Sequence, residues 1–146
     1  MTRKALMLLA TIALMVVAAS AVATAATTQG QSQASPFTKA HLEPVHDSGV
    51  HGTVYLSQLP TEGTQIVVQA KGLKPGKRYV SLYYDNGRCA LEPYSEDDVI
   101  GGPYTALPGG FGFTTGTADD DLDEINSVSV RSANNFKLRA CARVHH

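Results

Sequence analysis

The strongest constraint on the fold is the regular alternation of apolar and polar residues along much of the chain. A period of two is typical of β-strands that bury one face, whereas apolar residues of an amphipathic helix recur every three to four positions. Helical periods are nearly absent here. The chain therefore predicts an all-β domain of antiparallel strands, each half-buried. The alternating segments are VHGTVYLS (50–57), GTQIVVQAKGL (63–73), GKRYVSLYYDNG (76–87), INSVSVRS (125–132) and FKLRACARV (136–144).

The phase of the alternation predicts which side chains face the core. We expect even-numbered residues of the segments 78–84 and 136–144 to point inward and odd-numbered residues to point outward. Ser81 would then lie outside. In FGFTTGT, we expect Phe111 and Phe113 to point inward.

The connections between these segments carry turn residues. Pro75-Gly76 fits a type II turn because glycine accepts a positive φ without steric cost. Asn86-Gly87, Pro108-Gly109-Gly110 and Asn134-Asn135 also separate strand patterns. About seven short strands with turns at these intervals predict a β-sandwich or a flattened barrel.

The chain begins with the pattern of a secretory signal peptide. Arg3 and Lys4 precede an uncharged apolar run over 5–22, and small residues around Ala23 and Ala25 form the site that a signal peptidase reads. Cleavage there would place the protein in the periplasm or outside the cell. An uncleaved membrane anchor is the alternative, since a run of this length could just span a bilayer.

The rest of the chain is predicted to form one domain. We expect a signal peptide over 1–25, a flexible polar leader over 26–40 and a single β-domain over 41–146. Loss of the signal would change the formal net charge from −1 to about −3, because Arg3 and Lys4 leave with it. This charge is too small and of the wrong sign for binding nucleic acid or an anionic membrane. We therefore expect no nucleic-acid partner, and no membrane insertion after cleavage.

The two cysteines, Cys89 and Cys141, favour a disulfide, because an even number of cysteines in an exported protein usually forms bridges. A metal pair or two free thiols are the alternatives, but neither cysteine has a second ligand at metal-binding spacing. The strand phase places Cys141 on the outward face of the last strand. Its partner must therefore lie in a segment laid over the outside of the sheet, and the irregular stretch 87–103 can provide it.

The order GLKPG, strand, NGRC and terminal RACARV resembles the copper/zinc superoxide dismutase family, and DLDEINSVSVR (121–131) is similar to the penultimate strand of bacterial relatives. The resemblance covers about 49–144. It implies a Greek-key β-sandwich in which the last strand lies beside the first. It also implies a bridge between Cys89 and Cys141.

The metal ligands of that family have no counterpart in the middle of this chain. Ser81 and Tyr83 stand at the positions of a ligand His-x-His pair, and Arg131 best matches a further ligand histidine. No histidine occurs between Gly52 and Val144. Copper in such a site needs neutral imidazoles, while serine and tyrosine are poor substitutes and arginine stays charged. The resemblance therefore implies a relative without superoxide dismutase activity, and we expect no catalytic residues and no cofactor.

The five histidines lie near the two ends of the domain. If the last strand runs beside the first, His145 and His146 could approach His41 or His46 and hold copper or zinc. The simpler interpretation is that the terminal pair is frayed and that the others are ordinary surface residues. We expect no metal site, and we keep these four histidines as the candidates for one.

Outward tyrosines offer a candidate binding patch. Tyr55, Tyr79 and Tyr83 should share the outer surface with Arg131, and aromatic and arginine side chains are frequent at binding surfaces. The alternative, which we prefer, is that the stretch 87–103 covers these residues as a second small core.

The acidic run over 119–124 lacks the spaced ligands of a calcium loop. We expect it to be a solvated loop.

The sequence thus favours an exported, non-catalytic domain that acts as a binding or structural module of the cell envelope or the extracellular space. Its partner would be a protein or a small ligand that the sequence does not identify, and self-association is a further option. A metal-binding relative of superoxide dismutase that uses the terminal histidines is the alternative.

Overall fold

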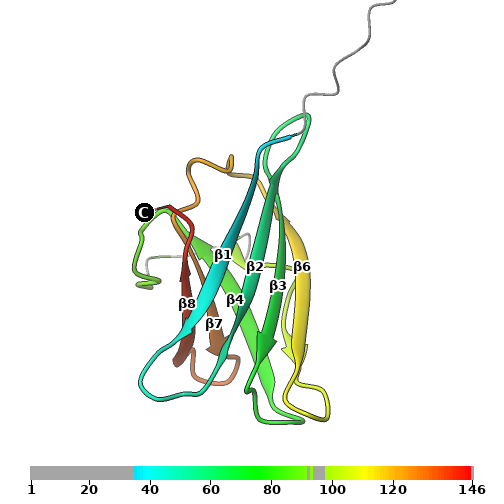
Figure 1. Ribbon diagram of the computed structural model, residues 1–146, viewed down its shortest axis with the longest axis vertical. Helices are drawn as coiled ribbons and strands as arrows, with labels where there is room; N and C mark the ends of the chain where they lie inside the picture. Colours follow the sequence, from blue (N-terminus) through cyan, green and yellow to red (C-terminus); the bar gives the residue numbers. More distant parts are fainter. Residues whose placement is uncertain (1–34, 92, 94–97, 146) are drawn as a thin grey trace, which may run out of the picture. The chain divides into compact units, whose positions relative to one another are not determined.

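The computed structural model describes residues 35–91, 93 and 98–145, and Figure 1 shows their fold. Antiparallel strands form one sheet of eight in the order β5-β4-β7-β8-β1-β2-β3-β6. The outermost strands β5 and β6 contact each other, so the sheet nearly closes into a barrel. The strands are β1 (Phe37–Pro44), β2 (His51–Gln58), β3 (Thr64–Lys71), β4 (Arg78–Tyr84), β5 (Tyr104–Thr105), β6 (Gly112–Ala118), β7 (Ser127–Ser132) and β8 (Leu138–Arg143).

The connections follow a Greek-key pattern, which confirms the predicted all-β fold class. The strands β1, β2 and β3 form consecutive hairpins, while β6 returns to lie beside β3 and β7 lies between β4 and β8. The last strand lies beside the first, with Glu43 opposite Cys141 and Pro44 opposite Ala140. In the described part of the chain, no helix is long and apolar enough to cross a membrane.

The core fills the inside of this barrel with the residues that the alternation selected on β2, β3 and β7. Leu56, Ile66 and Val130 have no exposed surface. These side chains belong to one continuous cluster that also includes Ala140 and Ala142 of β8. Burial of apolar surface of this kind is the main favourable contribution to folding.

Strand β1 begins inside the segment that was predicted as a flexible leader. It starts at Phe37, whereas we expected the domain to begin at residue 41, and residues 37–42 pair along β2. The predicted signal peptide, 1–25, lies outside the described residues. The apolar–polar alternation did not predict β1, because its buried apolar residues are only Ala40 and Leu42. Pro44 also suggested a loop.

The predicted phase of β4 is wrong. Ser81 lies opposite Val130, so Tyr79, Ser81 and Tyr83 face the barrel interior. The even-numbered residues instead form a second, outer cluster with Cys89. The two faces could not be told apart because both are buried, and a strand covered on both sides has no polar face to set its phase.

The predicted orientation of Phe111, which precedes β6, and of Phe113 within it is also wrong. Phe111 is 49% exposed and Phe113 is 56% exposed, while Gly112 and Thr114 point inward. A side chain at Gly112 would not fit, because a Cβ there would lie 2.4 Å from Leu73 Cδ1 and 2.7 Å from the ring of Tyr104. Small residues therefore face inward where the barrel closes, and the large ones face outward.

A β-bulge changes the phase at the start of β8. The pairing with β7 shifts between Val130 and Arg131, so that Arg131 lies opposite Leu138 and Val130 opposite Ala140. The extra residue turns Leu138 toward the outer cluster, where Phe136 also packs. The expected inward orientation therefore holds for Ala140 and Ala142 but not for Leu138.

Candidate functional site

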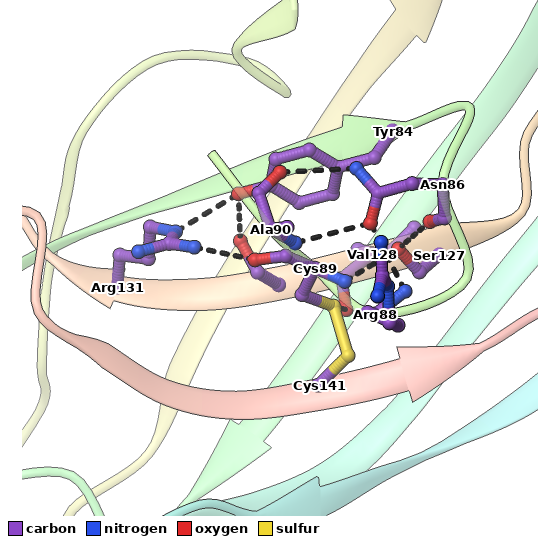
Figure 2. The surroundings of a disulfide bond; sticks show 10 residues. Tyr84, Asn86, Arg88, Cys89, Ala90, Ser127, Val128, Arg131 and Cys141 are labelled. Carbon is purple, nitrogen blue, oxygen red and sulfur yellow. Dashed lines mark hydrogen bonds between the residues drawn. A yellow bond between two sulfur atoms is a disulfide. The ribbon is translucent and has the colours of Figure 1, made fainter. Parts of the chain in front are cut away.

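The predicted bridge between Cys89 and Cys141 is present, with the two Cα atoms 6.0 Å apart. Figure 2 shows how it joins the segment after β4 to the outer face of β8. The backbone N–H of Cys89 donates to Ser127 Oγ at 3.1 Å. The side chain of Asn86 orders the preceding turn, since its Oδ1 accepts from the N–H groups of Arg88 and Ala90. The sequence argument that a covering segment provides the partner of Cys141 is therefore confirmed.

Arg131 is buried under this segment, with only 5% of its surface exposed. Its guanidinium donates from Nε to Tyr84 Oη at 2.9 Å, from Nη1 to the carbonyl of Phe136 at 2.6 Å and from Nη2 to the carbonyl of Cys89. Figure 2 shows the hydrogen bonds from Arg131 to Tyr84 and to Cys89. Every one of these acceptors is a neutral oxygen, and the Tyr84 ring lies 5.9 Å from the guanidinium carbon. Arg131 therefore holds the bridged segment against β7.

Ser81 and Tyr83 of β4, which the sequence resemblance aligned with a His-x-His pair, lie inside the barrel. Ser81 has no exposed surface, and its Oγ lies 3.1 Å from Tyr104 Oη. Burial raises the pKa of Tyr104 to about 12. The hydrogen bond to Ser81 lowers this pKa in part, and the nearby Tyr79 raises it further. Tyr83 packs in the main core. We expected Ser81 and Tyr83 to point outward, and both are buried.

The predicted tyrosine patch is not assembled on the surface. Tyr79 and Tyr83 are only 5% and 6% exposed, and both pack in the main core. Arg131 is buried on the other face of its sheet. Only Tyr55 is partly accessible, and its ring stacks on Phe37 with 6.2 Å between centroids. The stretch after β4 does cover a second small core, as we preferred, but that core contains Leu82 and Tyr84 instead of the predicted tyrosines.

The histidine candidates do not converge within the described residues. His41 lies exposed on β1, and His46 lies in the loop that follows this strand. The Nε2 atom of His145 is 3.1 Å from the carbonyl oxygen of Leu122. His146 lies outside the described residues. Over 35–91, 93 and 98–145, no group of three histidine, cysteine or acidic side chains is arranged to hold a metal ion.

The acidic run over 119–124 forms the connection between β6 and β7. Asp121 Oδ1 accepts hydrogen bonds from the side chain of Gln58 at 2.6 Å and from the backbone of Gly63 at 3.0 Å. Glu124 in turn accepts from the N–H of Asp121. These carboxylates therefore accept hydrogen bonds from neighbouring backbone N–H groups and from a side-chain amide.

A groove of about 600 Å³ lies between β1 and β8. Antiparallel pairing between these strands reaches only from Glu43 to Pro44, and one further bond joins the Val45 N–H to the carbonyl of Arg139. Continuing the same register would place Leu42 opposite Ala142 and His41 opposite Arg143, yet no pairing is present there. The two strands separate, and the groove lies between their edges. We call it the β1–β8 groove, and its lining residues are Lys39, Ala40, His41, Glu43, Val45, Arg88, Leu138, Cys141, Arg143 and Val144.

The β1–β8 groove has basic rims and a largely apolar floor. Lys39, Arg88 and Arg143 are exposed along it, and Glu43 is the single carboxylate in the lining. Arg88 comes from the segment that the disulfide holds in place, so the bridge positions one of the three cations. The groove can therefore offer strand-edge hydrogen bonds, an apolar surface and positive charge together.

Sequence reasoning did not find the β1–β8 groove. Its residues come from β1, the bridged segment and β8, and only long-range pairing brings them together. The sequence does contain two of its cations, Lys39 and Arg143, at polar positions of β1 and β8. That these two strands are neighbours is known only from the structure.

No protein-family model, curated protein or solved structure significantly matches the chain.

Proposed function

We propose that this chain is an exported, non-catalytic binding domain built on a superoxide dismutase-like barrel that has no copper site. One feature implied by the resemblance supports the scaffold: Cys89 is bridged to Cys141. The last strand does not pair with the 50–57 segment but with β1, which precedes the residues that carry the resemblance. The signal-peptide pattern of residues 1–25 supports export.

The burial of the ligand-equivalent residues supports the absence of catalysis. Ser81 is paired with Tyr104, Tyr83 fills the core, and Arg131 holds the bridged segment. Each of these side chains has a structural role that leaves it inaccessible to a substrate. Neither a hydroxyl nor a guanidinium replaces the imidazoles that hold copper through a redox cycle.

The observation that carries the binding role is the gap in pairing between β1 and β8. Open strand edges present unpaired N–H and C=O groups, and an extended peptide can add to them as a further strand. The cations Lys39, Arg88 and Arg143 around this gap favour acidic side chains on the peptide. We therefore propose that the β1–β8 groove binds an extended acidic segment of another protein.

The proposal is tested by titrating the isotope-labelled protein with a short peptide of alternating valine and glutamate, while amide NMR signals are followed. We expect saturable shifts at the amides of 38–42 and 142–144. Arg143→Gln should weaken binding about fivefold, since an exposed charge pair contributes about 1 kcal/mol. Lys71→Gln removes the same charge outside the groove and should leave the affinity unchanged.

A peptide of alternating valine and lysine serves as the ligand control. Equal binding of both peptides would show that the basic rims do not select the ligand. Shifts spread over the whole barrel, or the same loss for Lys71→Gln as for Arg143→Gln, would show that the groove is not the site.

The alternative function, metal binding by the terminal histidines, has less support. His46 follows β1 at the end where β1 and β8 pair, whereas His145 follows β8 at the opposite end and contacts Leu122. A metal site would need His41 and His145 to be joined by further ligands. Metal analysis of the protein purified under native conditions distinguishes this alternative from the binding domain.

A further inference from the structure

A second hollow, of about 290 Å³, lies at the end of the barrel where β3 turns into β4 and β7 turns into β8. Four cationic residues line it, and no carboxylate does. We call it the basic pocket, and its lining residues are Lys74, Lys77, Arg78, Tyr79, Ser132, Asn134, Asn135 and Arg139.

Backbone hydrogen bonds fix both rims of the basic pocket. On one side, the N–H of Lys77 donates to the carbonyl of Lys74 at 3.1 Å. On the other side, the N–H of Phe136 donates to the carbonyl of Ser132 at 2.9 Å. The N–H of Ala133 donates to the carbonyl of Arg78 at 3.0 Å and joins the two rims. Lys74 and Lys77 are therefore carried by an ordered turn, and Arg78 and Arg139 by the strands β4 and β8.

Two polar side chains inside the basic pocket are also oriented. Arg139 Nε donates to Ser132 Oγ at 2.8 Å, which leaves the two Nη groups of the guanidinium to donate elsewhere. Tyr79 is 5% exposed, and its hydroxyl accepts from the N–H of Lys74 at 3.0 Å. The phenolic O–H can still act as a donor. The pocket thus combines fixed positive charge with neutral donors from Tyr79 and the asparagine amides.

The distribution of charge leaves this pocket without neutralising carboxylates. Four of the chain's 12 lysine and arginine residues line it, in a protein whose formal net charge is −1. The acidic segment 119–124 and Glu62 lie in the connections at the opposite end of the barrel, as Figure 1 shows. Asp47 lies at the same end as the pocket but does not line it. Clustered like charges repel one another, so an anion that binds between them is favoured.

We propose that the basic pocket binds a phosphate group. Its four cations line a hollow of about 290 Å³ that is large enough to admit a phosphate group. Arginine forms paired hydrogen bonds to phosphate oxygens. Lysine ammonium groups add point charge, and the amides of Asn134 and Asn135 add neutral donors. The same chemistry would accept free phosphate or the phosphate of a lipid headgroup. Neither the pocket nor its test depends on the β1–β8 groove.

The test is a titration of the purified protein with inorganic phosphate at low ionic strength, with chloride as the reference salt and amide NMR as the readout. We expect saturable shifts at Arg78, Ser132 and Arg139. Arg139→Gln should weaken phosphate binding at least tenfold, because it removes charge-assisted hydrogen bonds. Lys137→Gln removes a cation from the same hairpin that does not line the pocket, and should change the affinity less than twofold.

Lys77→Gln provides a second variant at an exposed residue of the pocket. Its loss of affinity tests the site if the Arg139→Gln variant does not fold. Vesicles that contain an anionic phospholipid separate the two sources of phosphate. Vesicle binding that phosphate displaces assigns a headgroup, and saturable phosphate binding without vesicle binding assigns a soluble phosphate. Shifts that do not saturate, or equal losses in Lys77→Gln and Lys137→Gln, would overturn the proposal.

Discussion

At the scale of single residues, the buried polar groups of this barrel are matched by partners. Among the described residues, every buried side-chain nitrogen and oxygen has a hydrogen-bond partner. Arg131 is the largest of these groups, and its partners are neutral oxygens from β4 and from the segments that flank β7. A buried polar group stabilises a fold only when its partners are in place, so the position of Arg131 makes it structural.

Replacing Arg131 with methionine should destabilise the protein by about 2 to 4 kcal/mol, because the buried carbonyls of Cys89 and Phe136 lose their charged donor. Urea unfolding followed by circular dichroism measures this change. Arg143→Met is the matched control, since that arginine is exposed on the neighbouring strand and its loss should cost less than about 0.5 kcal/mol. Equal effects of the two substitutions would contradict the role given to Arg131.

The raised pKa of Tyr104 predicts that the free energy of unfolding falls at alkaline pH. Its pKa rises from the ordinary value of 10.0 to about 12 in the folded protein. The folded state therefore keeps a proton that the unfolded chain releases above about pH 10. The stability from this proton is complete below that pH and is lost as the pH rises through the folded pKa. At about pH 11 the loss should be about 1.4 kcal/mol.

The comparison that isolates this effect is Tyr104→Phe, which has no phenolic proton at this position. Between about pH 9 and pH 11, its free energy of unfolding should fall by about 1.4 kcal/mol less than that of the wild type. Its loss of the Ser81 contact lowers stability at both pH values and cancels in the comparison. Parallel pH profiles for the two proteins would show that Tyr104 does not titrate as expected.

At the scale of strands and segments, the period-two alternation predicted most of the sheet. Strands β2, β3 and β7 formed with the expected inner faces because one side of each packs in the barrel core. The phase failed for β4 and β6. Strand β4 is covered on both faces, and β6 points glycine and threonine inward because Leu73 and Tyr104 already fill the space beneath it. These failures come from long-range packing, which alternation within one strand does not encode.

The disulfide joins the segment after β4 to β8. Cys89 and Cys141 are separated by 52 residues. Loop entropy predicts that the double substitution of both cysteines by serine lowers the free energy of unfolding by about 4 kcal/mol. Reduction of the wild-type protein should give a loss of similar size in the same urea experiment. A double variant as stable as the oxidised protein would show that Arg131 and the outer cluster hold the segment without the bridge.

At the scale of the whole domain, each candidate site is lined by segments that are far apart in the sequence. The sequence alone therefore did not identify either hollow. The bridge was predictable because strand phase and cysteine count pointed to the same pair. The β1–β8 groove was not, since the first half of β1 was taken for a leader and the gap in its pairing with β8 is evident only in the three-dimensional structure. The basic pocket likewise joins two turns that are far apart in the sequence.

The opposite charges at the two ends of the barrel are a further property of the whole domain. Burial raises the pKa of Asp120, and the negative charges of Glu124, Asp98, Asp119 and Asp85 raise it further. The end that carries 119–124 therefore holds carboxylates that repel one another, together with Arg88 and Arg143 of the β1–β8 groove. The other end carries the four cations of the basic pocket. Such a separation orients a charged partner as it approaches.

The central claim is that this barrel serves contact with other molecules and does not transfer electrons. It is tested most directly by adding copper to the purified protein and measuring superoxide removal against the same concentration of free copper. The account predicts no rate beyond that of free copper, because Ser81, Tyr83 and Arg131 are committed to the fold. A copper-dependent rate faster than that of free copper would contradict it, and the same measurement on the His41→Ala/His145→Ala variant would show whether the histidines hold the metal.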